Sequence, residues 1–258
     1  MMAISQFLGR TPVFTSNEFE VMFPNSQTDR NLLSRAVASG KVDKVRRGVY
    51  VSRTGRFEGS PVDPLQVAAA STDDCTFCLL TALQVHGVLH NLVFRNQFYT
   101  ERRMMPFTYA GVDYQPIKVD LSTVAARERS NAQGRRVRVS TREQTILDCL
   151  DSPSVAGGTE NVLRSVSGFN LVDIDALISL TSARSAASAA RVGWLAESLA
   201  EPWHVTQSQL GRLHDLASGA TAYFGSGTRV GADRWINNWR LYLPAPRDEV
   251  ASWLNPRL

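Results

Sequence analysis

The sequence predicts an α+β fold, mainly α, in which a small N-terminal domain is followed by a larger mixed α/β C-terminal domain. Apolar residues recur at helical spacing over most of the 258 residues, whereas alternating β-forming residues occupy only a few short runs. Positive charge is concentrated in the first fifth of the chain, which sets that part apart. Hydrophobic residues make up 43% and charged residues 20% of the chain, a composition that indicates a globular protein.

Three helices are expected in the first forty residues. The start and stop signals place them at about Ile4–Leu8, from the polar run Phe14–Glu18 to about Met22, and from Ser26 or Thr28 to Ser39. In the third helix a buried stripe is expected to contain Leu32, Leu33, Ala36 and Val37. Gly40 then ends this helix, because glycine is the common residue just beyond a helix C-terminus.

Strand character replaces helical spacing after Gly40. Val42, Val45 and the run Val49–Val51 have β-forming side chains, and Arg46-Arg47-Gly48 between them indicates a turn. Helix, turn, helix and then a basic two-stranded ribbon is the order of a winged helix-turn-helix. The sequence therefore predicts such a domain over residues 1–55.

The charge distribution favours a phosphate-binding role for this domain. Residues 1–57 contain nine basic and four acidic side chains, whereas the rest of the chain contains nineteen basic and twenty acidic ones. A basic module on a near-neutral protein is typical of contact with a nucleic acid. A solvated basic face without a partner accounts for the charge alone equally well.

The third helix and the ribbon contain the side chains that DNA recognition uses. Arginine suits guanine and asparagine suits adenine in the major groove, while lysine and arginine on a ribbon suit phosphates. The candidate DNA-binding residues are Thr28, Arg30, Asn31, Ser34, Arg35, Lys41, Lys44, Arg46 and Arg47. The alternative is a winged helix that contacts only other proteins.

The C-terminal domain is expected over residues 62–258, after a polar loop or linker at 52–64. Its helices are expected at about 63–70, 76–86, 140–150, 158–166, 173–180, 186–199 and 206–216, and its short strands at 97–100, 114–121 and 137–139. The tail alternates glycine-rich turns with aromatic residues, which indicates a strand pair or an extended segment. Its role after about residue 206 stays unassigned.

A second basic segment lies between the predicted strands and the helix at 140–150. Its arginines form a possible second surface for phosphates or for an acidic partner: Arg127, Arg129, Arg135, Arg136 and Arg138. The alternative is a solvated face, which is the usual fate of such a run.

The motifs of several enzyme classes are missing from the sequence. The chain has only three lysines, and none stands in the Gly-Lys-Ser/Thr of a P-loop or the acidic-x-Lys of common nucleases. Gly225-Ser226-Gly227 is not followed by the Asp-x-Asp pair that a nucleotidyltransferase needs. We therefore expect no enzymatic activity, no catalytic residue and no cofactor.

Cysteines and histidines do not form a recognisable metal site. Cys75-x-x-Cys78 has only Cys149 and four dispersed histidines to complete the four ligands that zinc requires. Burial as small apolar residues is the favoured interpretation, with reduced thiols in a cytoplasm. The chain has no run of eighteen apolar residues and no secretory signal at its start, so we expect a cytoplasmic protein without membrane insertion.

Several segments occur in the order found in one family. They are the helix and ribbon Leu33–Val42 and Val45–Tyr50, then Thr81–Val88 ("TALQVHGV"), Val139–Asp151 with "EQTILDCL", Ala156-Gly157-Gly158, and Arg191–Leu195 ("RVGWL"). With them the chain resembles the AbiEi family of bacterial antitoxins, which are also autorepressors. The resemblance covers roughly residues 10–200.

The resemblance implies a function as well as a fold. AbiEi proteins belong to type IV toxin–antitoxin systems of phage defence, bind inverted repeats in their own promoters and counteract a cognate nucleotidyltransferase toxin through the C-terminal domain. It implies a non-enzymatic protein, monomeric or weakly dimeric in solution, with two copies on operator DNA. In this light His86 is a helix-end residue packed near Gly87, Glu143 is a capping-box member, and Asp148 is a possible partner of an arginine.

Two other functions are kept as alternatives. The first is a winged-helix transcriptional regulator whose C-terminal domain senses a small ligand. The second is a DNA-processing enzyme with a winged-helix targeting module, which the missing active-site motifs disfavour.

Overall fold

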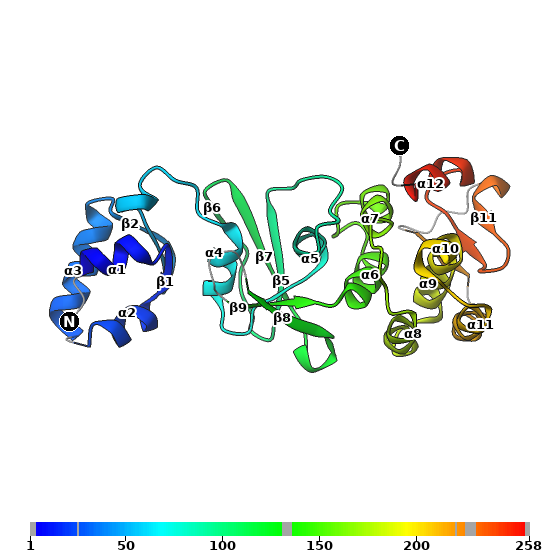
Figure 1. The fold of residues 1–258 in the computed structure, drawn as a ribbon, viewed down its shortest axis with the longest axis horizontal. Helices are drawn as coiled ribbons and strands as arrows, with labels where there is room; N and C mark the ends of the chain where they lie inside the picture. Colours follow the sequence, from blue (N-terminus) through cyan, green and yellow to red (C-terminus); the bar gives the residue numbers. More distant parts are fainter. Residues whose placement is uncertain (1–3, 25, 131–135, 220, 225–230, 256–258) are drawn as a thin grey trace. The chain divides into compact units, whose positions relative to one another are not determined.

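A computed structural model describes residues 4–24, 26–130, 136–219, 221–224 and 231–255 (Figure 1). The fold is a mixture of α and β structure in which helices predominate, as expected from the sequence. The chain forms two compact units. The first comprises Met1–Thr76, Phe94–Asp120 and Arg129–Val137, and the second comprises Phe77–Val93, Leu121–Glu128 and Arg138–Leu258.

The first unit begins with a compact arrangement that we call the first module, residues 4–52. Its elements are α1 (Ile4–Arg10), β1 (Val13–Thr15), α2 (Ser16–Met22), α3 (Ser26–Ala38), β2 (Val42–Arg46) and β3 (Val49–Ser52). The three strands form an antiparallel sheet in the order β1-β3-β2. The three helices and the strands after Gly40 were expected, whereas β1 was not.

Local capping explains where α2 begins. The hydroxyl of Thr15 accepts a hydrogen bond from the backbone N–H of Glu18 at 3.1 Å, and the Glu18 carboxylate accepts one from the N–H of Thr15 at 2.7 Å. This reciprocal pair is a capping box, which satisfies backbone donors that the first helical turn leaves free. The same residue ends β1, so the chain turns from strand to helix within one position.

Aromatic side chains fill the core of the first module. Phe7 packs edge-on against Phe14 and Phe23 with ring centroids 5.2 and 5.6 Å apart, and Phe19 completes the cluster. Leu33, Ala36 and Val37 of α3 pack against this cluster. The expectation that Leu32 is buried with them is wrong, because successive helical residues differ by about 100° and Leu32 falls outside the narrow stripe.

The β2–β3 hairpin turns at Arg47 and Gly48. Arg46 pairs with Val49, and Gly48 has φ +80°, a value that glycine adopts without strain. The register shifts between Lys44 and Arg46, so one extra residue bulges out of β2. The turn is therefore one residue shorter than expected from the sequence.

The rest of the first unit adds a second sheet and a covering helix. Its elements are η1 (Gly55–Phe57), α4 (Pro64–Ser71), the short strand β4 (Thr76–Phe77) at the unit boundary, β5 (Arg95–Thr100), β6 (Phe107–Tyr109) and β7 (Val112–Lys118). Strands β5 and β7 are parallel, β6 and β7 are antiparallel, and α4 packs against β1, β3 and β5. Helix α4 therefore connects the first module with this sheet.

The second unit is built largely of helices. They are α5 (Leu79–Val85), α6 (Arg142–Asp151), α7 (Thr159–Val166), α8 (Ile174–Ser182), α9 (Ala186–Ser198), α10 (Ala200–Trp203), α11 (Gln207–Leu216), α12 (Arg247–Trp253) and the short η2 (Leu121–Thr123) and η3 (Ala232–Arg234). Helix α6 packs against α5, α7, α8 and α9, so it occupies the centre of this group. Strands β8 (Ala126–Ser130) and β9 (Arg136–Ser140) are neighbours in their sheet.

Two expectations for this region need correction. The helix expected at 76–86 is a strand over Thr76–Phe77 followed by α5, because Cys78 is the N-cap and the β-forming Thr76 and Phe77 stay extended. The stretch between the helices expected at 186–199 and 206–216 was expected to be non-helical, but it contains the helical turn α10, which His204 ends with a left-handed backbone.

The C-terminal tail forms a small sheet and a last helix. Strands β10 (Ala222–Tyr223), β11 (Trp235–Ile236) and β12 (Leu241–Tyr242) lie in the order β10-β12-β11. The aromatic residues of the tail were expected in a strand pair or an extended segment, and α12 was not expected. Trp239 is buried, and its indole N–H donates to Glu197 of α9 at 2.6 Å, which holds the tail on the helices.

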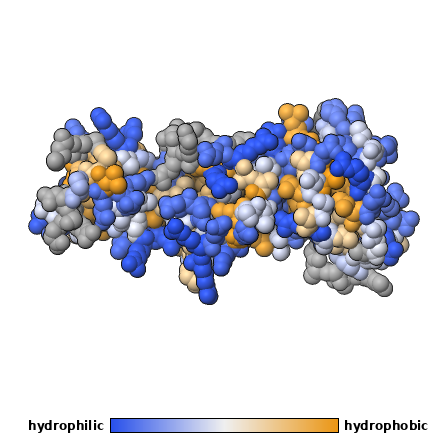
Figure 2. All heavy atoms as spheres, turned by 90° about the horizontal axis from the view of Figure 1, so that it is seen from below, coloured by the Kyte–Doolittle hydropathy of each residue, from blue (hydrophilic) through white to orange (hydrophobic). Residues whose placement is uncertain are grey.

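On the face drawn in Figure 2, hydrophilic residues (blue) are widespread and several hydrophobic areas (orange) lie among them. The exposed large hydrophobic side chains include Leu92, Phe94, Met105 and Leu171. Across the described ranges, every helix is too short or too polar to span a lipid bilayer.

Candidate nucleic-acid interface

Helix α3 presents a polar face away from the core of the first module. Thr28, Asn31, Ser34 and Arg35 are exposed, in contrast to Leu33 on the opposite side of the helix. Asparagine and arginine on an exposed helical face are the side chains that form paired hydrogen bonds with adenine and guanine. The side chain of Arg30, the remaining candidate on this helix, lies outside the described ones.

Three further candidates are exposed around the β2–β3 hairpin: Lys41, Lys44 and Arg47. Arg47 is at the tip of the hairpin, in its two-residue turn. Lys44 and Ser34 line the same groove of about 420 Å³, which α2 and Tyr50 complete. The structure thus brings the polar face of α3 and a hairpin lysine to one groove, although they are separated in the sequence.

Arg46 is in a different environment from its neighbours. Its guanidinium carbon lies 5.0 Å from the centroid of the Phe107 ring of β6, and the side chain is half-buried. Phe107 in turn stacks on Tyr114 of β7, with centroids 4.6 Å apart and the rings almost parallel. Arg46 is therefore engaged within the protein, whereas Lys44 and Arg47 are exposed.

A hydrogen-bonded cluster lies beside this pair and joins the same two hairpins. One carboxylate oxygen of Asp43 accepts from the Tyr109 hydroxyl at 2.8 Å and from Arg53 Nε at 2.7 Å. Arg53 also donates to the Tyr109 oxygen at 2.8 Å and to the carbonyl of Ser60 at 3.0 Å. The β6–β7 hairpin is thereby fixed to β2 of the first module and to Arg53, the residue that follows β3.

Burial and hydrogen bonding in this cluster favour a protonated Tyr109 and a charged Arg53. Burial raises the pKa of Tyr109, and its hydrogen bond to Asp43 raises it further, so the phenol stays protonated. The hydrogen bond to Asp43 raises the pKa of Arg53 despite partial burial. Sequence patterns did not single out Phe107, Tyr109 or Asp43, because these contacts join residues up to 66 positions apart.

The second basic surface is described only in part. Arg127 of β8 and Arg138 of β9 are exposed. Arg135 lies outside the described residues, and so do the side chains of Arg129 and Arg136. The proposal that these five arginines form one surface stays a prediction.

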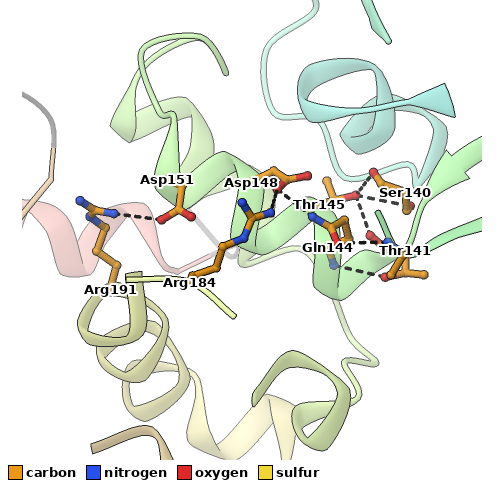
Figure 3. A network of polar contacts seen from close by, with 9 residues as sticks. Ser140, Thr141, Gln144, Thr145, Asp148, Asp151, Arg184 and Arg191 are labelled. Carbon is orange, nitrogen blue, oxygen red and sulfur yellow. Dashed lines mark hydrogen bonds and ion pairs between the residues drawn. The ribbon is translucent and has the colours of Figure 1, made fainter. Parts of the chain in front are cut away.

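Helix α6 carries a polar network that connects it with the turn between α8 and α9 and with α9 itself (Figure 3). Asp148 is buried and accepts hydrogen bonds from Gln144 at 2.8 Å and from Arg184 at 3.1 Å. Arg191 of α9 forms an ion pair with Asp151 at 3.0 Å. The expected arginine partner of Asp148 is confirmed as Arg184. Each charged group in this network has a partner of opposite charge, so the network stabilises the packing of α6.

The start of α6 differs from the expected capping box. Thr141 caps the helix by accepting from the N–H of Gln144 at 3.2 Å, but the Gln144 side chain accepts from the N–H of Ala125 instead of Thr141. Glu143 accepts from the N–H of Asp173 at 3.0 Å. These longer-range contacts replace the reciprocal half of the box and connect α6 with the residue before β8 and with the N-cap of α8.

His86 ends α5 as expected, with Gly87 following in a positive-φ conformation. Its Nε2 lies 2.9 Å from the carbonyl oxygen of Ser140, and its ring packs against Phe169. Its contacts are those of a packed helix-end residue.

The three cysteines are buried and are not joined in a disulfide, which confirms their interpretation as small core residues. Burial raises the pKa of Cys75 and of Cys149, so these thiols stay protonated. Among the described residues, no group of three or more histidine, cysteine or acidic side chains gathers at metal-binding distance.

Comparison with known proteins adds no family assignment. No family model matches the chain, and no curated protein matches it.

Proposed function

We propose that residues 4–52 form a winged helix-turn-helix that binds duplex DNA. The observation that carries the proposal is the element order α1-β1-α2-α3-β2-β3 together with the strand order β1-β3-β2. This order supports a winged helix, in which α3 would be the recognition helix and the β2–β3 hairpin the wing. The exposed Asn31, Arg35 and Arg47 occupy the positions that would meet bases and phosphates.

Two acidic groups of the module are engaged within the protein, whereas Glu20 is exposed and lines the groove with Lys44. Glu18 is committed to the capping box of α2, and Asp43 is neutralised by Arg53. Lys41, Lys44 and Arg47 around the hairpin remain exposed. Contacts of these cations with phosphates would release counterions and so give an affinity that falls steeply with salt.

The wider proposal is a repressor and antitoxin. It rests on the ordered segments that resemble the AbiEi antitoxins, and it assigns DNA binding to the winged helix and neutralisation of a nucleotidyltransferase toxin to the C-terminal domain. Two copies would bind an inverted repeat upstream of the protein's own gene, since a palindromic site presents the same half-site twice.

DNA binding is tested with the DNA upstream of the reading frame, by measuring the dissociation constant over a series of salt concentrations. The double variant Lys44→Gln, Arg47→Gln should flatten the log–log salt slope by about 1.8, since each lost phosphate contact removes about 0.9. The matched control is Arg102→Gln, Arg103→Gln, which removes two exposed arginines of the same unit. Equal effects of the two double variants would contradict the proposed interface.

The antitoxin function is tested by co-expression with the protein encoded by the adjacent reading frame. If that frame encodes a nucleotidyltransferase that arrests growth, the full chain should restore growth. The Lys44→Gln, Arg47→Gln variant should restore growth as well, because neutralisation is assigned to the C-terminal domain. A failure of the wild-type chain to restore growth would refute the antitoxin function and leave DNA binding unaffected.

A ligand-controlled regulator is the second candidate, and one cavity favours it. A cavity of about 720 Å³ lies between α1 and α3, with Leu8 and Leu32 as apolar lining and Arg35 and Lys41 as cationic lining. This volume is in the range of small-molecule sites, and the lining suits an apolar anion. Such a ligand would compete with DNA for Arg35. Titration of operator complexes with apolar carboxylates should then release DNA, whereas acetate should not.

A further inference from the structure

Arg46 was predicted to contact DNA, but another part of the protein already engages its side chain. The half-buried side chain lies over Phe107, whereas its neighbour Arg47 is exposed at the tip of the hairpin. The bulge at the preceding position of β2 shifts the register, which separates the environment of Arg46 from that of Lys44. Of these two adjacent cations, Arg47 is thus exposed to solvent and Arg46 contacts an aromatic ring.

The contact with Phe107 satisfies Arg46 only in part. A guanidinium over an aromatic ring gains about 0.5–2 kcal/mol from the negative face of the ring. One terminal nitrogen, Nη1, is nevertheless buried without a hydrogen-bond partner among the described residues. A phosphate oxygen would be a strong acceptor for this nitrogen, but it cannot reach the atom while the atom stays buried.

The position of Phe107 is fixed by contacts that do not involve Arg46. Its ring stacks on Tyr114, and two residues later Tyr109 is hydrogen-bonded to Asp43 and Arg53. The β6–β7 hairpin is consequently held against the wing, and the ring stays where it meets Arg46. The ring therefore competes with DNA for the same cation.

We propose that Phe107 sequesters Arg46 from DNA, so that the β6–β7 hairpin sets how many phosphates the wing can neutralise. Phe107 acts here as a positioning residue, since it touches Arg46 and not the nucleic acid. The inference rests on the proposed DNA-binding function and deepens it. It predicts that the wild-type wing binds DNA through Lys44 and Arg47, whereas Arg46 stays on Phe107 and does not contact DNA.

The test is a double-mutant cycle on the full chain, with salt-dependent binding to duplex DNA as the measurement. Phe107→Leu keeps an apolar side chain on Tyr114 but removes the ring, and it should steepen the log–log slope by about 0.9. With such a slope, each tenfold dilution of salt increases the affinity of the variant about eightfold more than that of the wild type. Arg46→Ala should leave the wild-type slope unchanged and should cancel the effect of Phe107→Leu. Phe94→Ala, at an exposed phenylalanine of the same unit, is the control and should change nothing.

A second measurement needs no DNA, so it separates this inference from the proposed function. Phenylglyoxal modifies accessible arginines, and peptide mass spectrometry reports the rates at Arg46 and Arg47 separately. In the wild type Arg46 should react several-fold more slowly than Arg47, and Phe107→Leu should bring the two rates together. If wild-type Arg46 and Arg47 react equally, or if Arg46→Ala weakens wild-type DNA binding as much as Arg47→Ala, sequestration is refuted. If DNA binding is absent but the rates differ as expected, the proposed function fails and the contact stands.

Discussion

At the scale of single residues, Asp43 shows how one carboxylate can organise two hairpins. The oxygen that binds Arg53 also accepts from Tyr109, so the ion pair and the phenol hydrogen bond depend on each other. Removal of the Tyr109 hydroxyl leaves the Arg53–Asp43 pair intact but removes the link to β6. The effect of that hydroxyl on stability can therefore be measured separately from the charge pair.

Tyr109→Phe should lower the free energy of unfolding by about 1 kcal/mol, because two hydrogen bonds to charged groups are lost at a half-buried site. The measurement is urea unfolding at pH 7. Thr108→Val is the control, since it removes a neighbouring hydroxyl that is exposed and donates to Asp113. Its effect should stay within about 0.5 kcal/mol. Similar losses for both variants would mean that the link to Asp43 adds no stability.

Asp74 provides a pH-dependent test in the same unit. Burial alone would raise the pKa of its carboxyl, but hydrogen bonds from Thr72, from Thr100 at 2.7 Å and from the N–H of Glu101 at 2.8 Å lower it overall. A carboxyl with a lowered folded-state pKa stabilises the fold above its ordinary value of 3.8 and loses that contribution as the pH falls through the folded value.

Asp74→Asn should therefore be destabilised by about 1 kcal/mol at pH 7, after allowance for the partial solvent exposure of the site. The difference between wild type and variant should shrink as the pH falls below about 3.8. Urea unfolding at a series of pH values from 7 to 2.5 measures it. A difference that stays constant over this range would show that the ionised carboxylate is not the stabilising species.

At the scale of elements, the packing of the tail on α9 depends on one glycine. A Cβ built at Gly193 would overlap the ring of Trp239, so the indole lies directly on the helix backbone. Glycine lowers helix stability by up to about 1 kcal/mol relative to alanine. Here that cost is offset by the burial of a tryptophan and by its hydrogen bond to Glu197.

Gly193→Ala should destabilise the second unit by about 2–3 kcal/mol, because the indole must leave its site or the helix must shift. Gly211→Ala in α11 is the matched variant, since a Cβ there meets nothing within 4 Å and its φ is not positive. It should stabilise the protein by about 0.5–1 kcal/mol through helix propensity. Thermal unfolding with tryptophan fluorescence distinguishes them. Equal melting temperatures would contradict the packing described here.

The elements that could be predicted are those with local signals. Asp63, Thr141 and Thr206 each cap a helix within one or two residues of the expected start. Strands β1 and β6 could not be predicted, because each is three residues long and exists only through a partner strand. The register that forms β1 joins Val13 to Val51, a contact that no local pattern contains.

In the candidate site, too, features with a local sequence signal could be predicted, whereas those that depend on tertiary contacts could not. Exposure of Lys44 and Arg47 follows from their place beside a hairpin turn, which the alternation of valines and the Arg-Gly pair made visible. The engagement of Arg46 could not be predicted, since Phe107 belongs to another hairpin. Charge counting assigned all three cations the same role, and only the tertiary contacts separate them.

At the scale of the whole molecule, the net charge of +4 conceals an asymmetry between the first fifth of the chain and the rest. The cations in the first 57 residues exceed the acidic groups by five, while the remainder is close to neutral. Long-range attraction to DNA should therefore come mainly from the N-terminal part, because the basic and acidic side chains of the rest of the chain almost cancel when counted together.

This asymmetry suggests an experiment that distinguishes one DNA-contacting surface from two. If only the first module meets the phosphates, Arg127→Gln, Arg138→Gln should leave the salt slope of the full chain unchanged, although it removes the same charge as Lys44→Gln, Arg47→Gln. If the second basic surface also contacts DNA, the slope should flatten by about 1.8 in both double variants. We expect the first result, because the excess positive charge of the chain lies in its first 57 residues, whereas the rest of the chain contains nineteen basic and twenty acidic side chains. A flattened slope in the Arg127, Arg138 variant would extend the interface to β8 and β9.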